Sequence, residues 1–349
     1  MSVGASAGEG AKKLGEKLMA EVEVEDLSSV LKSLRELRVA PNETPNTHIF
    51  FGIPEIDILF PSSTSPILEL VSPPPTHHPS GAGKTSLLYL IIAHAILPTT
   101  FSSTPLSGQN AAVILFDPLH HFSVPRLAKV IFTIISTTLH SAAKEIEPLK
   151  PAIKTLIATS LLHVHIFRPQ SWSATLSTLK SMPDYLFDEE RHKSKHRRIH
   201  SIVLEDVDAF VWSIRSSVST DLTATPESNL TSASTLLTSA LMQLHTQFSC
   251  GVILTSHSTT PSSFRPAIPT SWPKEVSTTR LAVRRVEVLK FAPALSVEEA
   301  EIERAQRWDV VKKGRFEVWK IGAGVGAGNG EGFVFRIGDE GVGIERNEK

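Results

Sequence analysis

A lysine and a threonine follow two closely spaced glycines in residues 80–86, which read SGAGKTS. Glycines let consecutive backbone N–H groups converge on a phosphate, and a helix that follows presents its positive end to the same anion. Lys84 would then reach the β and γ phosphates of a nucleotide, and the Thr85 hydroxyl would coordinate magnesium. The sequence therefore predicts a nucleotide-phosphate site formed by Ser80, Gly81, Ala82, Gly83, Lys84, Thr85 and Ser86.

The start of this loop departs from the usual pattern, because His78 stands at the position of the first glycine. The alternative interpretation is a helix that happens to begin with glycines. A strand predicted at 67–71 and a helix predicted from 85 to about 97 flank the motif, as a phosphate loop requires. This context favours nucleotide binding.

A magnesium ion in such a site is also held, through water, by an acidic residue at the end of a neighbouring strand. Residues 202–204, Ile-Val-Leu, are typical of a buried strand and run directly into Glu205 and Asp206. Either carboxylate fits this role, and the strand alone does not choose between them. A strand-end acid that only meets solvent is the alternative.

The elements that must position these residues alternate along the chain. Apolar strands are predicted at 67–71, 111–116, 161–167, 202–204 and 251–255, and helices at 85–97, 125–140, 172–186 and 233–248. Strands that alternate with helices predict an α/β fold whose mostly parallel central sheet is covered by helices on both faces. Later segments alternate with period two, at 280–291, 315–322 and 332–338, and predict an antiparallel C-terminal extension.

The composition excludes several classes of protein. The chain has 349 residues, of which 41% are hydrophobic and 20% charged, as in a soluble globular protein. The longest apolar run, 87–97, is shorter than the ~20 residues that cross a bilayer, so no membrane association is expected. The formal net charge of -1 gives no overall attraction to nucleic acid. The single cysteine, Cys250, excludes an internal disulfide, fits a reducing compartment and is expected in the core.

We expect one domain at 46–345, preceded by residues 1–45, which combine a disordered terminus with a short helix at 27–38. The apolar stripe of that helix is too small to form a core alone, so the helix either packs on the main domain or docks a partner. Two insertions, at about 189–200 and 216–234, are basic or polar and are predicted to be mobile surface loops.

Two segments carry cations that could meet DNA, since each neutralised phosphate releases counterions. The first is a basic run with Arg191, Lys193, Lys195, Arg197 and Arg198, for which a nuclear import signal and a solvated loop are the alternatives.

The second segment is the loop that follows His257. It offers Arg265 and Lys274 as cations, with Phe264 and Trp272 as stacking surfaces. An ordinary turn-rich loop is the alternative. Histidine pairs at 77–78 and 120–121, and the alternating pair at 163 and 165, lie in predicted turns or lack a nearby carboxylate, so no metal beyond magnesium is expected.

Longer segments carry a resemblance to a known family. They are FGIPEIDILF at 51–60, VILFDPLHHFSVPRL at 113–127 and GVILTSHS at 251–258. With the phosphate loop and the strand-end acids, they resemble the RecA-like recombinase family over roughly 51–260. Within that family, GAGKTSLLYLIIAHAILP at 81–98 and EDVDAFVW at 205–212 resemble the X-ray-repair cross-complementing type of recombinase paralogue, the second of that series.

The resemblance implies a RecA-like P-loop NTPase core that binds ATP and Mg²⁺. It implies an accessory role in DNA double-strand-break repair by homologous recombination, in the nucleus. The partners implied are other RecA-like recombinase paralogues in a hetero-oligomer that supports the strand-exchange recombinase. Single-stranded or branched DNA would be met through that complex.

Aligned on the AFxW segment, the family's strand-end aspartate falls on Glu205, with Asp206 as a close second. Leu119 stands where hydrolysing members carry their general-base glutamate, and leucine can neither accept a proton nor orient a water. His257 stands where the family has a glutamine that senses the γ-phosphate. The resemblance therefore implies ATP binding with weak or absent hydrolysis and no assigned catalytic residue. The alternatives are an active DNA-stimulated ATPase that remodels recombination intermediates, and a nucleotide-free scaffold subunit.

Overall fold

A computed structural model describes most of the chain beyond residue 48. The described residues are 12, 49–60, 65–76, 82–188, 190–217, 225–261, 263–286, 296, 298–299, 301, 304, 308, 312, 314–321, 332–339 and 341–345. Backbone contacts divide the chain into Met1–Asn46 and Thr47–Lys349, and every element below belongs to the second unit. The helix predicted at 27–38, the residues Ser80 and Gly81 of the predicted phosphate loop, and His78 lie outside the described residues.

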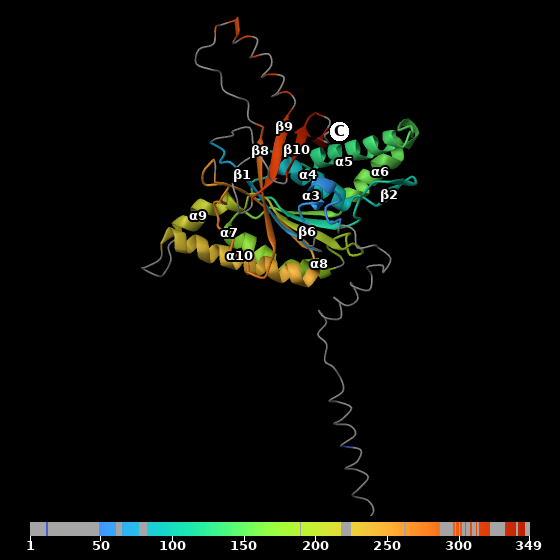
Figure 1. The fold of residues 1–349 in the computed structure, drawn as a ribbon. Helices are drawn as coiled ribbons and strands as arrows, with labels where there is room; N and C mark the ends of the chain where they lie inside the picture. The colour runs from blue at the N-terminus through green and yellow to red at the C-terminus, as the bar shows by residue number, and fades with distance from the viewer. Residues whose placement is uncertain are drawn as a thin grey trace, which may run out of the picture. The chain divides into compact units, whose positions relative to one another are not determined.

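The described strands form one large sheet in the order β11-β10-β9-β8-β1-β7-β6-β4-β5 (Figure 1). The strands are β1 (Ile67–Ser72), β4 (Ala112–Phe116), β5 (Val164–Phe167), β6 (Ile199–Leu204), β7 (Gly251–His257), β8 (Thr278–Arg285), β9 (Arg315–Lys320), β10 (Gly332–Ile337) and β11 (Val342–Glu345). The run from β8 to β5 is parallel, and β9, β10 and β11 continue it in antiparallel fashion. A separate hairpin pairs β2 (Thr100–Phe101) with β3 (Thr104–Pro105). The mostly parallel sheet with an antiparallel C-terminal extension is therefore confirmed.

Helices cover both faces of this sheet (Figure 1). On one face lie α4 (Lys84–Ile96), α5 (Val124–Ser141) and α6 (Lys150–Leu161), and on the other lie α7 (Trp172–Lys180), α8 (Met182–Phe187) and α10 (Pro226–Phe248). The short elements are α3 (Pro54–Asp57), η1 (Glu147–Leu149), η2 (Val207–Phe210) and α9 (Val211–Ser216). Each face carries its own hydrophobic core.

The central strand and its helix show why the apolar pattern was informative. All six residues of β1 are buried because β7 and β8 flank the strand and helices cover the sheet. Such strands read as continuous apolar runs. Helix α4 crosses from β1 toward β4 and is buried over most of its surface. It ends where Leu97 takes an extended conformation before Pro98, as residues before proline generally do.

Two predicted boundaries were wrong. The strand predicted at 161–167 begins only at Val164, because Leu161 is the last residue of α6, a helix that the sequence pattern did not reveal. The polar insertion predicted as a loop at 216–234 is helical from Pro226 onward. Thr225 and Ser228 form a reciprocal capping box there, so these two residues start a helix where the sequence pattern predicted a loop.

No helix in the described part of the chain is both long and apolar enough to cross a membrane.

Candidate functional site

The carboxyl ends of β1, β6 and β7 meet at one edge of the sheet. Ser72 at the end of β1 is in register with His257 at the end of β7, and Glu205 follows the last residue of β6. Helix α4 also begins at this edge, with Lys84 as its first residue. Crevices outside the carboxyl ends of parallel strands are the usual ligand sites of such sheets.

Gly83 shapes the turn into α4. Its φ of 91° lies in the left-handed region, and an added Cβ would stand 2.8 Å from the Phe316 ring and 2.9 Å from the Phe335 ring. Among the described residues, no side chain caps this end of the helix. The first backbone N–H groups of α4 are therefore not satisfied by a cap, and the helix dipole favours an anion there.

Lys84 is buried at the centre of the edge, with 7% of its surface exposed. Its Nζ donates a hydrogen bond to Ser72 Oγ at 2.7 Å and lies 3.1 Å from Nε2 of His257. Asp206 Oδ1 is 3.9 Å away. Burial lowers the pKa of Lys84, against the opposing effect of Asp206 and other nearby carboxylates. A buried ammonium is thus held where a phosphate chain would approach the start of α4.

Lys84 contacts β7, whereas Thr85, the next residue, contacts Glu205, which directly follows β6. Its hydroxyl donates a hydrogen bond to Oε1 of Glu205. The other oxygen, Oε2, is buried, and it finds no hydrogen-bond partner within the described structure. Burial raises the pKa of Glu205 to about 7, and the charges of Asp206 and Asp117 add to this shift. A hydroxyl beside a carboxylate with a spare oxygen is a donor set that fits magnesium.

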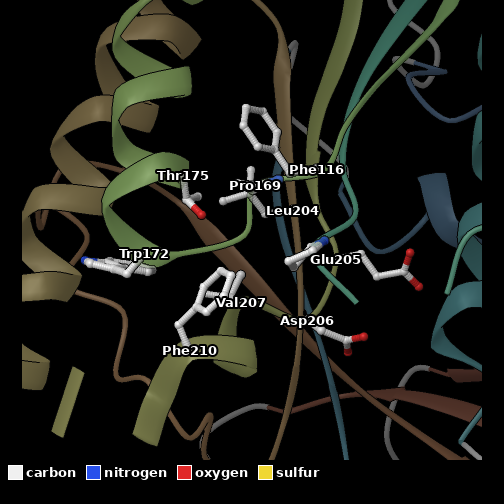
Figure 2. A pocket seen from close by; sticks show the side chains of 10 residues that line it. Phe116, Pro169, Trp172, Thr175, Leu204, Glu205, Asp206, Val207 and Phe210 are labelled. Atoms are coloured by element: carbon white, nitrogen blue, oxygen red, sulfur yellow. The ribbon is translucent and has the colours of Figure 1, made fainter. Parts of the chain in front are cut away.

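Asp206 has a different role from its neighbour. Its φ of 48° is left-handed, a conformation that aspartate tolerates better than most residues, and its N–H donates to Thr255 Oγ1 at 2.8 Å. Its carboxylate lies between Lys84 and His121, whose Nδ1 is 2.8 Å from Oδ2. Glu205 and Asp206 line a pocket together with Phe116, Trp172 and Phe210, and Figure 2 shows their carboxylates pointing away from the aromatic rings.

Asp208, on η2, was missed by the sequence analysis although it lies only two residues beyond the strand-end pair. Its Oδ1 accepts the backbone N–H of His257 at 3.2 Å, and its Oδ2 accepts Nδ1–H of the same residue at 2.9 Å. His257 therefore presents Nε2 to Lys84 as an acceptor. Asp206, Asp208 and His257 are a group in the described structure whose ligand atoms all lie within 4.8 Å of one another.

The turn after β4 borders the same site. Asp117 is fully buried and accepts the N–H groups of His121, at 2.8 Å, and Phe122, at 3.3 Å. The Ser123 N–H donates to the Tyr89 hydroxyl of α4 at 2.8 Å, which ties the turn to the helix. Leu119, in this turn, is 44% exposed and offers no polar atom.

The basic run lies at the amino ends of the parallel strands, opposite the carboxyl ends where Lys84 lies. It precedes β6, and the carbonyl of Arg198 pairs with the first residue of β4. Arg197 donates to the carbonyls of Ile96, at 2.7 Å, and Ala111, at 3.3 Å. Two of the residues in this segment, His192 and Ser194, are buried, so the segment packs on the fold and is not the loose surface loop that was predicted.

The cations of the basic run differ in the polar side chains that they contact and in their exposure to solvent. Arg191 pairs with Asp188 at 2.7 Å, and Arg198 donates to Gln109 at 2.8 Å. Lys193 and Lys195 are exposed. The structure does not bring these cations together with Lys84.

The aromatic side chains after His257 turn inward, which corrects the prediction that they form stacking surfaces. Phe264 is buried and its ring lies 5.1 Å from that of Trp319. Trp272 donates its Nε1–H to Glu69 of β1 at 2.6 Å. Arg265 and Lys274 remain exposed on the same loop.

His163, which precedes β5, and His165 on β5 take part in a polar network. Nδ1 of His163 and Nε2 of His165 lie 2.9 Å and 2.8 Å from Ser194 Oγ, and Nδ1 of His165 lies 2.8 Å from the Tyr185 hydroxyl. Burial lowers the pKa of both histidines to about 4. Cys250 is buried in the core beneath α10.

No protein-family model matches the chain, and a search of curated proteins finds no similar sequence.

Proposed function

We propose that this chain is a RecA-like P-loop NTPase domain that binds ATP with Mg²⁺ at the carboxyl edge of its sheet. One observation carries the proposal: Thr85 at the start of α4 contacts Glu205, a residue 120 positions away that follows β6. Lys84 and an uncapped helix N-terminus stand at the same place. Phosphate binding needs the lysine and the helix end, and magnesium needs the hydroxyl and the carboxylate.

Each residue would have a distinct role. The Lys84 ammonium would exchange Ser72 and His257 for phosphate oxygens. Thr85 and Glu205 would hold magnesium, which neutralises phosphate charge. Glu205 suits this role better than Asp206, because the Asp206 carboxylate already faces Lys84 and His121.

His257 would respond to the presence of a phosphate, because Lys84 is its neighbour at Nε2 and Asp208 fixes its ring from the other side. Its γ-phosphate-sensing role is part of the same proposal. Leu119 leaves the usual general-base position without a proton acceptor, which supports weak or absent hydrolysis.

In the cell, the protein would act as an accessory recombinase paralogue in nuclear double-strand-break repair by homologous recombination. The resemblance of residues 51–260 supports this role, within a hetero-oligomer of RecA-like paralogues that meets DNA. The exposed cations Lys193, Lys195, Arg265 and Lys274 are the candidates for DNA contact on this chain.

Isothermal titration calorimetry with ATP and magnesium tests the nucleotide site. Lys84→Ala should weaken binding about 10- to 100-fold, since hydrogen bonds to charged groups contribute about 1.5–3 kcal/mol. Lys154→Ala, which removes an exposed lysine on α6, is the matched control and should bind as the wild type does. No binding by the wild type would refute the proposal and favour a nucleotide-free scaffold, whereas equal affinity of wild type and Lys84→Ala would refute the proposed site by showing that ATP binds elsewhere.

A further inference from the structure

A histidine next to the proposed nucleotide site has one ring nitrogen fixed and the other without a partner. His121 is in the turn after β4, and its Nδ1 lies 2.8 Å from Asp206 Oδ2. Its side chain is 53% exposed. Its Nε2 has no hydrogen-bond partner among the described residues.

Hydrogen bonds of the backbone, as well as the contact of the ring with Asp206, hold His121 in place. Its N–H donates to buried Asp117, and two residues later Ser123 donates to Tyr89. Tyr89 is four residues after Thr85 on α4, so the two side chains share one face of the helix. The turn that carries His121 is thus held beside the same helix face that carries the predicted magnesium ligand.

The hydrogen bond to Asp206 also sets the tautomer of the ring. An ionised carboxylate can only accept, so the proton of neutral His121 stands on Nδ1 and the lone pair on Nε2. A histidine oriented by a carboxylate in this way is the arrangement of a general base. Asp206 would also stabilise the imidazolium that forms when Nε2 takes up a proton.

We propose that His121, oriented by Asp206, accepts the proton of the attacking water in a slow hydrolysis of ATP by this chain. This inference rests on the proposed ATP site. The water oxygen forms a bond to the γ-phosphorus, and the bond from that phosphorus to the β,γ-bridging oxygen breaks. The bridging electron pair leaves with ADP, and the water proton passes to Nε2 of His121. The proton then returns to solvent from the exposed edge of the ring.

Neighbouring groups are less suited to this role. Leu119 has no acceptor, and Glu205 is bound to Thr85. Both Nε2 of His257 and its Nδ1 have partners, Lys84 and Asp208. His120 has its Nε2 beside Gln170 at 3.4 Å and no carboxylate partner in the described structure.

The first test does not depend on turnover. ADP, magnesium and aluminium fluoride mimic the transferring phosphoryl group together with its attacking water. After gel filtration, the wild type should retain this trapped nucleotide, whereas His121→Ala should lose it. Calorimetry should give equal ADP affinities for the two proteins, because His121 is expected to hold the water and not the nucleotide.

The second test measures turnover with radiolabelled ATP. His121→Ala should lower the rate about 100-fold, a typical contribution of a general base, and added imidazole should restore part of it. His120→Asn is the matched control, since asparagine also tolerates the φ of 58° at that position, and it should hydrolyse ATP at the wild-type rate.

The outcomes separate the two proposals. If the wild type binds no ADP, the nucleotide site itself is refuted, and His121 has no such role. If ADP binds normally but wild type and His121→Ala trap nucleotide equally, or hydrolyse ATP at equal rates, including no detectable turnover by either, the role of His121 alone is refuted.

Discussion

The Nζ atom of Lys84 lies 3.1 Å from Nε2 of His257, and each side chain is held by a further residue. Ser72 accepts a second hydrogen bond from the ammonium, and Asp208 accepts one from Nδ1 of the imidazole. Ser72 and His257 are register partners on adjacent strands, so the sheet itself sets the spacing. Contacts within the chain thus order Lys84 and His257 at the proposed nucleotide site.

His257→Ala should destabilise the fold. Lys84 and Asp208 would each lose a partner in a mostly buried place, and hydrogen bonds to charged groups contribute about 1.5–3 kcal/mol. We expect the free energy of unfolding to fall by about 1–3 kcal/mol in urea titrations without nucleotide. His120→Asn should stay within about 0.5 kcal/mol of the wild type. A His257→Ala protein as stable as the wild type would show that the contact with Lys84 is energetically negligible.

Gly83→Ala should be costly for two reasons. Alanine rarely adopts a φ of 91°, and its Cβ would stand 2.8 Å from the Phe316 ring. We expect a loss of about 1–3 kcal/mol in the free energy of unfolding, together with weaker ATP binding, because the turn into α4 must shift.

Gly338→Ala is the control for this substitution, since a Cβ at Gly338 meets nothing within 4 Å. Urea titrations and calorimetry on both variants separate the effect of this turn from the general effect of replacing glycine. Equal behaviour of the two variants would contradict the steric argument.

Arg197→Ala should lower the stability of the fold, although Arg197 belongs to a basic run that could also contact DNA. Arg197 satisfies the carbonyls of Ile96 and Ala111, and unsatisfied buried carbonyls cost about 1–3 kcal/mol. Lys193→Ala removes an equal charge at an exposed position and should change stability by less than about 0.5 kcal/mol. Thermal unfolding of the two variants measures the difference, and equal melting temperatures would count against a structural role for Arg197.

The sequence predicted the parts of the site that depend on strong local patterns. A strand that is buried on both faces reads as an apolar run, so β1 and the acids after β6 were found, and Lys84 and Thr85 follow from the glycine-rich turn. The AFxW resemblance favoured Glu205 over Asp206, and the structure adds a physical reason, because the left-handed φ of Asp206 turns the two neighbouring carboxylates to different partners. No local pattern encodes that turn.

Other parts of the site depend on contacts between distant segments. Asp208 and His257 meet because η2 and the end of β7 are neighbours, and His121 meets Asp206 because β4 lies beside β6. The inward position of Trp272 depends on Glu69, a buried acid in the middle of the mostly apolar strand β1. An acid within a predicted buried strand could have indicated that some distant residue turns inward to pair with it, since buried carboxylates require partners.

The pH dependence of stability should report on Glu205. Burial raises its pKa from 4.5 to about 7 in the folded protein. The folded state then keeps a proton that the unfolded chain has released, so the stabilising contribution is full below about pH 4.5 and is lost as pH rises through 7. Without magnesium, the wild type should therefore lose stability between pH 5.5 and pH 8.

Glu205→Gln keeps the size of the side chain but cannot ionise, so it should remove this part of the pH dependence. At pH 8 the variant should exceed the wild type by about 1–3 kcal/mol in the free energy of unfolding, because no buried charge must form. Glu147→Gln, at an exposed carboxylate, should keep the wild-type slope. Magnesium with ATP favours the ionised form, so the same substitution should weaken their binding. Parallel stability curves for wild type and Glu205→Gln would mean that Glu205 titrates normally, and would remove the argument that its free oxygen is poised for a cation.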